Sequence, residues 1–492
     1  MRQLTSLDAQ FLAMESSRTY GHVGGLALFD PSAAPGGAVS SDDVARVIEQ
    51  RLHRLPPFSQ RLVEVPLGLD HPYWIEDPNF DIGFHVRDTA VPPPGDDRRL
   101  AETVARIFAR PLDRTRPLWE LYVIHGIEGG KLGMLSKMHH AAVDGVSGAE
   151  VMGVMFDLAA DTPADEGDPG ERPEPERVPT EMEMLGRGLR GLPRQPIRAL
   201  RSLPAAIPAL PNMPGAALMP GVPQLQRARA RFSRSETDAD LVTVRTSRAP
   251  KTRFNGRISP HRRFAFGTLS LGDIKALKDE LGIKVNDVVV GLCATAVRDW
   301  MIARDELPDE PLVALIPASV RTEEEQGTFG NKVTGMILPI PTDIADPRER
   351  LMRAHQLLMR AKGEKEGLPA SLMTDVSNFL PPAIFSRASR VALDVSGRLR
   401  PALNLIISNV PGPPVPLYCA GARMLANYPV SVITDGVGLN ITVMSYEDRI
   451  DFGIVADHDM IDDAWELMEA TENALEDLKR AILPKKKVSA ST

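Results

Sequence analysis

His139-His140-Ala141-Ala142-Val143-Asp144-Gly145 follows directly on an apolar run from Leu132 to Met138. If that run is a β-strand, successive side chains point to opposite faces, so only one of the two histidines can face a given cavity. A neutral imidazole can accept a proton from a hydroxyl group near neutral pH. Asp144 and Gly145 suit a tight exit from the strand, and we expect a helix to begin near Val146.

Three simpler interpretations of the histidines compete with a catalytic one. A lone histidine on an apolar strand is most often an ordinary core residue, which is how we interpret His125. A zinc site is disfavoured because neighbouring strand histidines diverge and no nearby cluster of cysteine, histidine or glutamate supplies further ligands. A serine nucleophile is disfavoured because the nearest serine, Ser147, lies in GVSGA and not in the Gly-x-Ser-x-Gly turn of hydrolases.

The whole pattern resembles the HHxxxDG motif of CoA-dependent acyltransferases and peptide-synthetase condensation domains. Five further blocks resemble bacterial wax ester synthase/diacylglycerol acyltransferases, in the same order along the chain: Leu4–Asp30, Pro111–Gly126, Asn255–Ala265, Val285–Trp300 and Ile407–Tyr418. The second block contains Pro-Leu-Trp ending at Trp119, and the fourth contains Asn286 followed by aspartate. Because the blocks spread over nearly the whole chain, it is identified as a member of that family.

The resemblance implies an α/β fold of two domains like chloramphenicol acetyltransferase subunits, each a mixed sheet flanked by helices. An active-site tunnel is expected between the domains, with the histidine motif at its middle. The implied boundaries are an N-terminal subdomain at 1–159, a crossover linker at 160–257, a C-terminal subdomain at 258–484 and a basic flexible tail at 485–492. At 492 residues the chain is long enough for two such cores.

Sequence periodicity predicts the main elements directly. The expected strands are His22–Phe29, Trp119–His125, Leu132–His139, Leu312–Ala318, Asn404–Ser408, Gly438–Ser445 and Ile450–Val455. The expected helices are Asp42–Leu55, Arg98–Arg110, Gly272–Asp279 and Asp462–Ala481. A further long helix should run to about Ile302 with Asn286 as its N-cap.

Site roles are carried over from the resemblance. His140 is implied to be the general base that deprotonates the acceptor alcohol, which attacks the thioester without an acyl-enzyme intermediate. His139 points away and supports the motif or contacts substrate. Asp144 is expected to pair with an arginine and brace the loop, and Arg321 is the candidate partner. Gly145 is expected to satisfy the backbone geometry of that loop.

Weaker hypotheses place four residues at the substrate tunnel: Trp119, Asn286, Ser408 and Asn409. Trp119 suits packing better than chemistry, and Asn286 suits a helix cap better than a catalytic role. Arg262 and Arg263 are candidate contacts for the phosphates of CoA, although adjacent arginines are also common on protein surfaces. The resemblance implies neither a metal nor a cofactor, because acyl-CoA is itself a substrate.

Composition excludes several other classes of protein. The net charge of −8 argues against a general nucleic-acid binder. Two cysteines cannot form a disulfide framework, which fits a reducing cytoplasm, and the N-terminus lacks the pattern of a signal peptide. Ser202–Gln226 carries no charged side chain, but its six prolines are incompatible with a transmembrane helix.

The linker changes composition abruptly from acidic to basic. Between Met184 and Ser235 there are nine arginines and no acidic residue. The segment suits a solvated crossover linker. It also suits a membrane-facing patch in which arginines meet anionic headgroups and Ser202–Gln226 rests in the interface. A nucleic-acid role is disfavoured because no aromatic residues alternate with the arginines.

The resemblance therefore implies a cytoplasmic O-acyltransferase that works peripherally at the plasma membrane or at lipid droplets. Its implied partners are a long-chain acyl-CoA and diacylglycerol, giving triacylglycerol, or a fatty alcohol, giving wax ester. A condensation-type enzyme that esterifies a polyketide or other alcohol is disfavoured by the Leu4–Asp30 block. A non-catalytic lipid-binding protein is disfavoured by the intact His140 and Asp144. Acceptor preference, acyl length and oligomeric state stay open.

Overall fold

The structure is a computed structural model that describes residues 1–143, 148–161, 176–191, 249–319, 333–363 and 401–483. Within these residues the strands form two six-stranded mixed sheets and one three-stranded sheet. The three-stranded sheet has the order β1-β4-β3, formed by Arg2–Gln3, Tyr73–Glu76 and Gln60–Val63 respectively. No helix in these ranges is both long and apolar enough to cross a membrane.

The first six-stranded sheet has the order β12-β13-β2-β7-β6-β5. Its strands are β2 (His22–Asp30), β5 (Val86–Ala90), β6 (Trp119–His125), β7 (Leu132–His139), β12 (Tyr418–Cys419) and β13 (Ala422–Val430). β5 and β6 run parallel, and the other neighbours are antiparallel. The motif strand β7 is therefore held on both sides, by β2 and by β6.

The helices of this half are α1 (Ser6–Met14), α2 (Ser41–Arg51), α3 (Ile82–His85), α4 (Asp97–Phe108), α5 (His140–Val143), α6 (Gly148–Met155) and α7 (Glu181–Gly191). Short 3-10 helices cover Pro35–Gly37, Leu52–Arg54, Pro56–Phe58, Pro66–Gly68 and Glu128–Gly130. α4 begins where it does because the Asp96 side chain accepts a hydrogen bond from the Arg99 N–H at 2.8 Å. Its buried face packs against β8 of the second sheet and joins a hydrophobic cluster with residues of both sheets.

The second six-stranded sheet has the order β10-β9-β11-β14-β15-β8. Its strands are β8 (Arg262–Ser270), β9 (Leu312–Ser319), β10 (Val333–Ile340), β11 (Leu405–Val410), β14 (Leu439–Tyr446) and β15 (Arg449–Asp457). Its helices are α11 (Leu271–Leu281), α12 (Val285–Ile302), α13 (Pro347–Gly363) and α16 (Trp465–Ile482). β11 runs parallel to both its neighbours, so this sheet is also mixed.

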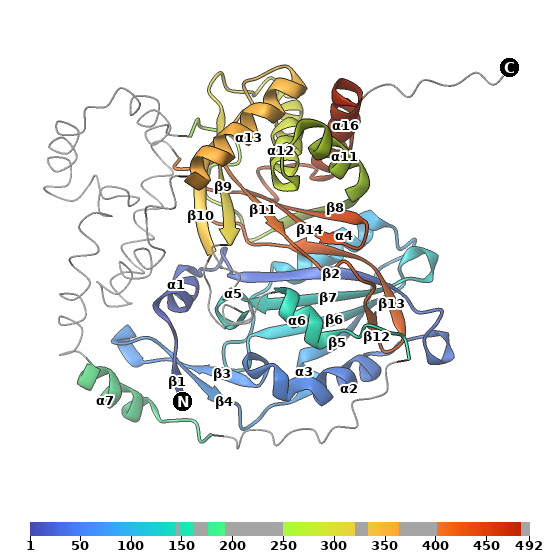
Figure 1. The fold of residues 1–492 in the computed structure, drawn as a ribbon. Helices are drawn as coiled ribbons and strands as arrows, with labels where there is room; N and C mark the ends of the chain where they lie inside the picture. Colours follow the sequence, from blue (N-terminus) through green and yellow to red (C-terminus); the bar gives the residue numbers. More distant parts are fainter. Residues whose placement is uncertain (144–147, 162–175, 192–248, 320–332, 364–400, 484–492) are drawn as a thin grey trace, which may run out of the picture.

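Figure 1 shows α11, α12, α13 and α16 gathered on one side of the second sheet, with the first sheet beneath it. One hydrophobic cluster joins the two halves, because it contains Leu26 and Tyr122 from the first together with Phe264, Phe266 and Val455 from the second. Burial of apolar surface across this boundary holds the halves in a fixed relation. The predicted α/β fold of two mixed-sheet units is confirmed.

Most predicted elements lie where the sequence patterns placed them, and Trp119–His125 and Leu132–His139 match β6 and β7 in both bounds. One expectation was wrong. Asn286 is not the N-cap of α12, because Lys284 occupies that position and its N–H is bound by Asp287 at 3.1 Å. The helix expected near Val146 corresponds to α6, which is described from Gly148, and the short helix α5 at His140 precedes it.

The sheets do not follow the division of the chain at residue 258. β13 comes from the second half, yet it pairs with β2 of the first sheet in antiparallel register from Val430↔Gly24 to Arg423↔Asp30. The close crossing of β13 with β15 requires Gly453, since a Cβ there would lie 1.7 Å from the Pro429 carbonyl oxygen. The second half therefore supplies two strands, β12 and β13, to the sheet that carries the histidine motif.

Candidate active site

The two motif histidines stand at the junction of β7 and α5. His139 is the last residue of β7 and is paired with His22 of β2. The His140 N–H donates to the Gly21 carbonyl at 2.7 Å, and the His139 N–H donates to the Leu118 carbonyl at 2.9 Å. Backbone hydrogen bonds to both neighbouring segments thus fix the chain where the two side chains diverge.

His140 lines a cavity of about 730 Å³ that lies between the two halves. Phe11 and Tyr20 come from the first half, while Leu315, Ile406 and Ser408 on β9 and β11 come from the second. His139 is 1% exposed and does not line this cavity. One histidine of the pair therefore faces the cavity, and the other is packed in the protein.

The His140 ring is held in a form suited to accept a proton. It stacks on Phe11 with ring centroids 4.0 Å apart and an interplanar angle of 16°. Burial is the main cause that lowers the pKa of His140 to about 4. Its Nδ1 is buried without a hydrogen-bond partner in the described part of the chain. At physiological pH the ring is therefore neutral.

His139 is held differently, by two hydrogen bonds. Its Nδ1 accepts the Ala141 N–H at 3.1 Å, so the ring proton lies on Nε2. Nε2 then donates to Oε1 of Glu15 at 3.0 Å. His139 is consequently fixed as one neutral tautomer whose two nitrogens are both occupied.

Glu15 follows the end of α1 and is held at both carboxylate oxygens. Oε1 also accepts the Gly21 N–H at 2.9 Å, and Oε2 accepts from the Arg114 guanidinium at 2.7 Å. Burial would raise the pKa of Glu15, but the hydrogen bonds from His139, Arg114 and Gly21 lower it to about 2. The carboxylate is therefore charged throughout the neutral range.

Of the four residues predicted to lie at the substrate tunnel, only one lines the cavity. Ser408 lines the cavity, whereas Asn286 and Asn409 do not line it and hydrogen-bond to each other at 3.2 Å. Trp119 is 2% exposed, stacks between Phe58 and His85, and donates from Nε1 to the Phe58 carbonyl at 2.9 Å. Its observed contacts are packing contacts.

The motif-loop residues Asp144 and Gly145, and the predicted partner Arg321, lie outside the described residues. Pairing of Asp144 with Arg321 therefore stays a prediction.

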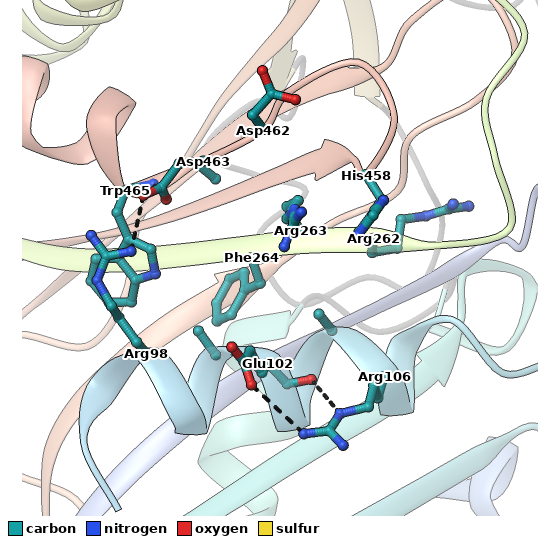
Figure 2. A pocket seen from close by; sticks show the side chains of 13 residues that line it. Arg98, Glu102, Arg106, Arg262, Arg263, Phe264, His458, Asp462, Asp463 and Trp465 are labelled. Carbon is teal, nitrogen blue, oxygen red and sulfur yellow. Dashed lines mark hydrogen bonds and ion pairs between the residues drawn. The ribbon is translucent and has the colours of Figure 1, made fainter.

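Arg262 and Arg263 line a second, smaller pocket of about 340 Å³ between α4, β8 and the start of α16. Figure 2 shows Arg98 reaching Asp463 and Arg106 reaching Glu102, and these arginines thus have carboxylate partners. Within the described ranges, Arg262 and Arg263 form no ion pair with a carboxylate. Arg262 donates to the carbonyls of Ser259, at 2.8 Å, and of Arg18, which lines the main cavity.

Sequence reasoning missed four residues of the site: Phe11, Glu15, Gly21 and Arg114. They fall within Leu4–Asp30 and Pro111–Gly126. These two blocks supported the family resemblance, but no role was assigned to these four residues within them. A lone glutamate after a short helix is normally a solvated side chain. Only the fold brings it to a histidine 124 residues away.

A solved O-acetyltransferase shares this architecture. The trichothecene 15-O-acetyltransferase TRI3 from Fusarium sporotrichioides superposes with a TM-score of 0.56 at 13% identity, covering 98% of this chain and 94% of that one. At this identity the likeness concerns the fold. The two proteins therefore share the arrangement of two mixed sheets flanked by helices.

Sequence comparison identifies the family. Residues 4–289 match the wax ester synthase/diacylglycerol acyltransferase catalytic domain, and residues 329–479 match the WS/DGAT C-terminal domain. A putative diacylglycerol O-acyltransferase of Mycobacterium tuberculosis is 35% identical over 97% of this chain and 90% of its own. The wax ester synthase/diacylglycerol acyltransferase from Marinobacter aquaeolei VT8 is 28% identical with a TM-score of 0.65, covering 97% of this chain and 99% of that one. The chain belongs to the wax ester synthase/diacylglycerol acyltransferase family and is an enzyme.

Proposed function

We propose that the protein transfers a long acyl chain from acyl-CoA to the hydroxyl group of diacylglycerol, forming triacylglycerol, and also to fatty alcohols, forming wax esters. The observation that carries the proposal is a neutral His140 on the wall of a cavity shared by the two halves. The names of the relatives support the acceptor and the reaction class.

In the proposed reaction His140 accepts the hydroxyl proton as the alcohol oxygen attacks the thioester carbonyl carbon. The new C–O bond forms, the C–S bond breaks, and the proton passes from His140 to the departing CoA thiolate. A base in this position contributes about 10²–10⁴-fold. Since a thiolate leaves readily, the step requires no covalent acyl-enzyme.

The cavity suits this chemistry in size and in lining. Its volume of about 730 Å³ lies in the range of ligand-binding cavities. Phe11, Val23, Leu315 and Ile406 give it apolar walls that suit an acyl chain. Shielding from bulk water would protect the thioester from hydrolysis.

The simplest test is thiol release from palmitoyl-CoA, with diacylglycerol or hexadecanol as the acceptor. Release that requires either alcohol, together with recovery of the matching ester, is the expected result. Release that is independent of both acceptors would contradict the proposed transferase. The ratio of the two acceptor rates would assign the preferred product.

We further assign the phosphates of CoA to the smaller pocket that contains Arg262 and Arg263. Arg263 has a buried Nε without a partner in the described part of the chain, and guanidinium groups bind phosphate well. The pocket adjoins the main cavity because Arg262 reaches from it to the carbonyl of Arg18. A donor bound there would have its nucleotide end outside and its acyl end toward His140.

Replacing Arg263 with glutamine should raise the KM for palmitoyl-CoA about tenfold, because one charge-assisted phosphate contact is lost. The KM for S-palmitoyl-pantetheine, which lacks the phosphates, should not change. Arg46→Gln is the matched control, since Arg46 is an exposed arginine on α2 that pairs with Asp43. An equal change with both thioesters would contradict the assignment.

Membrane docking is proposed through the basic segment Met184–Ser235, of which residues 192–235 lie outside the described part. Its described beginning is the second part of α7, where Leu189 is 52% exposed beside Arg187 and Arg190. An exposed apolar side chain beside arginines suits an anionic lipid surface. The proposed location is the inner face of the plasma membrane or a lipid droplet.

Binding to anionic vesicles should weaken at high salt and again when five arginines become glutamine: Arg187, Arg190, Arg194, Arg198 and Arg201. Each engaged arginine contributes roughly 1 kcal/mol, so three of them would change partitioning by about a hundredfold. Vesicle co-sedimentation measures the change, with Arg46→Gln as the control. Binding that neither salt nor the substitutions alter would identify the segment as an ordinary linker.

A further inference from the structure

We propose that Glu15 is a positioning residue for the proposed general base. In this arrangement its carboxylate holds the His139 ring and the Gly21 backbone, and through them sets the place of His140. The inference rests on the proposed role of His140 and adds a group that the family motif does not contain.

The path from Glu15 to His140 consists of short contacts. Oε1 accepts both the His139 Nε2–H, at 3.0 Å, and the Gly21 N–H, at 2.9 Å. The carbonyl of the same Gly21 accepts the His140 N–H at 2.7 Å. One carboxylate oxygen thus ties the ring of the first histidine to the residue that anchors the backbone of the second.

The Glu15 carboxylate is also held by Arg114, through its second oxygen. Arg114 donates to Oε2 of Glu15 at 2.7 Å and to the Leu12 carbonyl at 2.9 Å, and it also reaches Glu64 at 3.1 Å. Both oxygens of Glu15 are therefore committed to protein partners, although the side chain borders the cavity. This occupation suits a group that positions others, and leaves little capacity to bind substrate.

The surroundings leave little freedom for another arrangement. A Cβ added at Gly21 would lie 2.8 Å from Nε2 of His139. The backbone at position 21 lies so close to the His139 ring that glycine is required there. α1, which leads into Glu15, also carries Phe11, whose ring stacks on His140 at 4.0 Å. The same short helix therefore sets both the backbone and the ring plane of His140.

Glu15→Ala should lower kcat about tenfold, because the base loses its fixed position, while the KM for palmitoyl-CoA changes less than twofold. Glu15→Gln should restore part of kcat, since its amide oxygen can still accept from His139 and Gly21. Glu64→Gln is the matched control. It also loses a contact to Arg114, but it does not touch the histidines, and its kcat should equal that of the wild type.

Amide hydrogen exchange supplies a readout that does not depend on turnover. The amides of Gly21 and His140 should exchange faster in Glu15→Ala than in the wild type or in Glu64→Gln. Unchanged exchange, an unchanged kcat, or a loss confined to KM would overturn the proposal. If the wild type itself transfers no acyl group, the proposed function fails, whereas the exchange result still decides whether Glu15 holds this backbone.

Discussion

Replacing His140 with alanine is expected to lower acyl transfer by about 10²–10⁴-fold, the usual contribution of a positioned general base. The ring lines the cavity and is partly buried, so its removal enlarges existing space without leaving a charged group unpaired. The fold should therefore survive. Turnover would be measured by product ester from labelled palmitoyl-CoA, and folding by circular dichroism and the melting temperature.

Two comparison variants separate the base from its surroundings. His125 is not the core residue that the sequence suggested, because it is half-exposed at the end of β6 and pairs with Asp88. His125→Ala should therefore retain full activity. His139→Ala should reduce activity less than His140→Ala, but it should lower the melting temperature more, because it leaves the buried Glu15 without its ring partner. Near-normal turnover of the His140 variant would show that another group is the base.

Local patterns were sufficient for the strands that carry the motif. Trp119–His125 and Leu132–His139 are apolar runs separated by Gly126, Gly129 and Gly130, and all three glycines have positive φ. Glycine adopts such a backbone without steric cost, so the turn and the strand ends are visible in the sequence. The place of the histidine pair at a strand end follows from the same signal.

Long-range contacts were not visible in the same way. β13 has a mixed pattern with a proline at position 429, and it joins a sheet whose other long strands lie about 300–400 residues earlier, a separation for which short-range periodicity carries no signal. The approach of Glu15 to His139 likewise depends on how α1 packs beside α5. The cap of α12 was misplaced because Asp287, inside the first turn, binds the Lys284 N–H that precedes the helix.

On the acid side of the pH profile, kcat/KM should fall with a midpoint near pH 4 and not near 6.5, the ordinary pKa of histidine. Burial is the main cause that lowers the pKa of His140 to about 4, and a base works only in its neutral form. At pH 5 about 90% of such a ring is neutral, against about 3% of an unperturbed one. The value of kcat/KM at pH 5 should thus be about thirtyfold higher than a normal histidine would allow.

The hydrogen bond between His139 and the charged Glu15 carboxylate should persist over the pH range of this experiment. The pKa of Glu15 is lowered to about 2, so its contribution to stability is fully present above its ordinary value near 4.5 and is lost progressively as the pH falls from there to about 2. Labelled acyl-CoA should be used because thiol reagents react slowly in acid, and circular dichroism at each pH would exclude unfolding. Because kcat/KM reports the free enzyme, an acid limb near 6.5 in a folded protein would mean that His140 is solvated, or that a different group is the base.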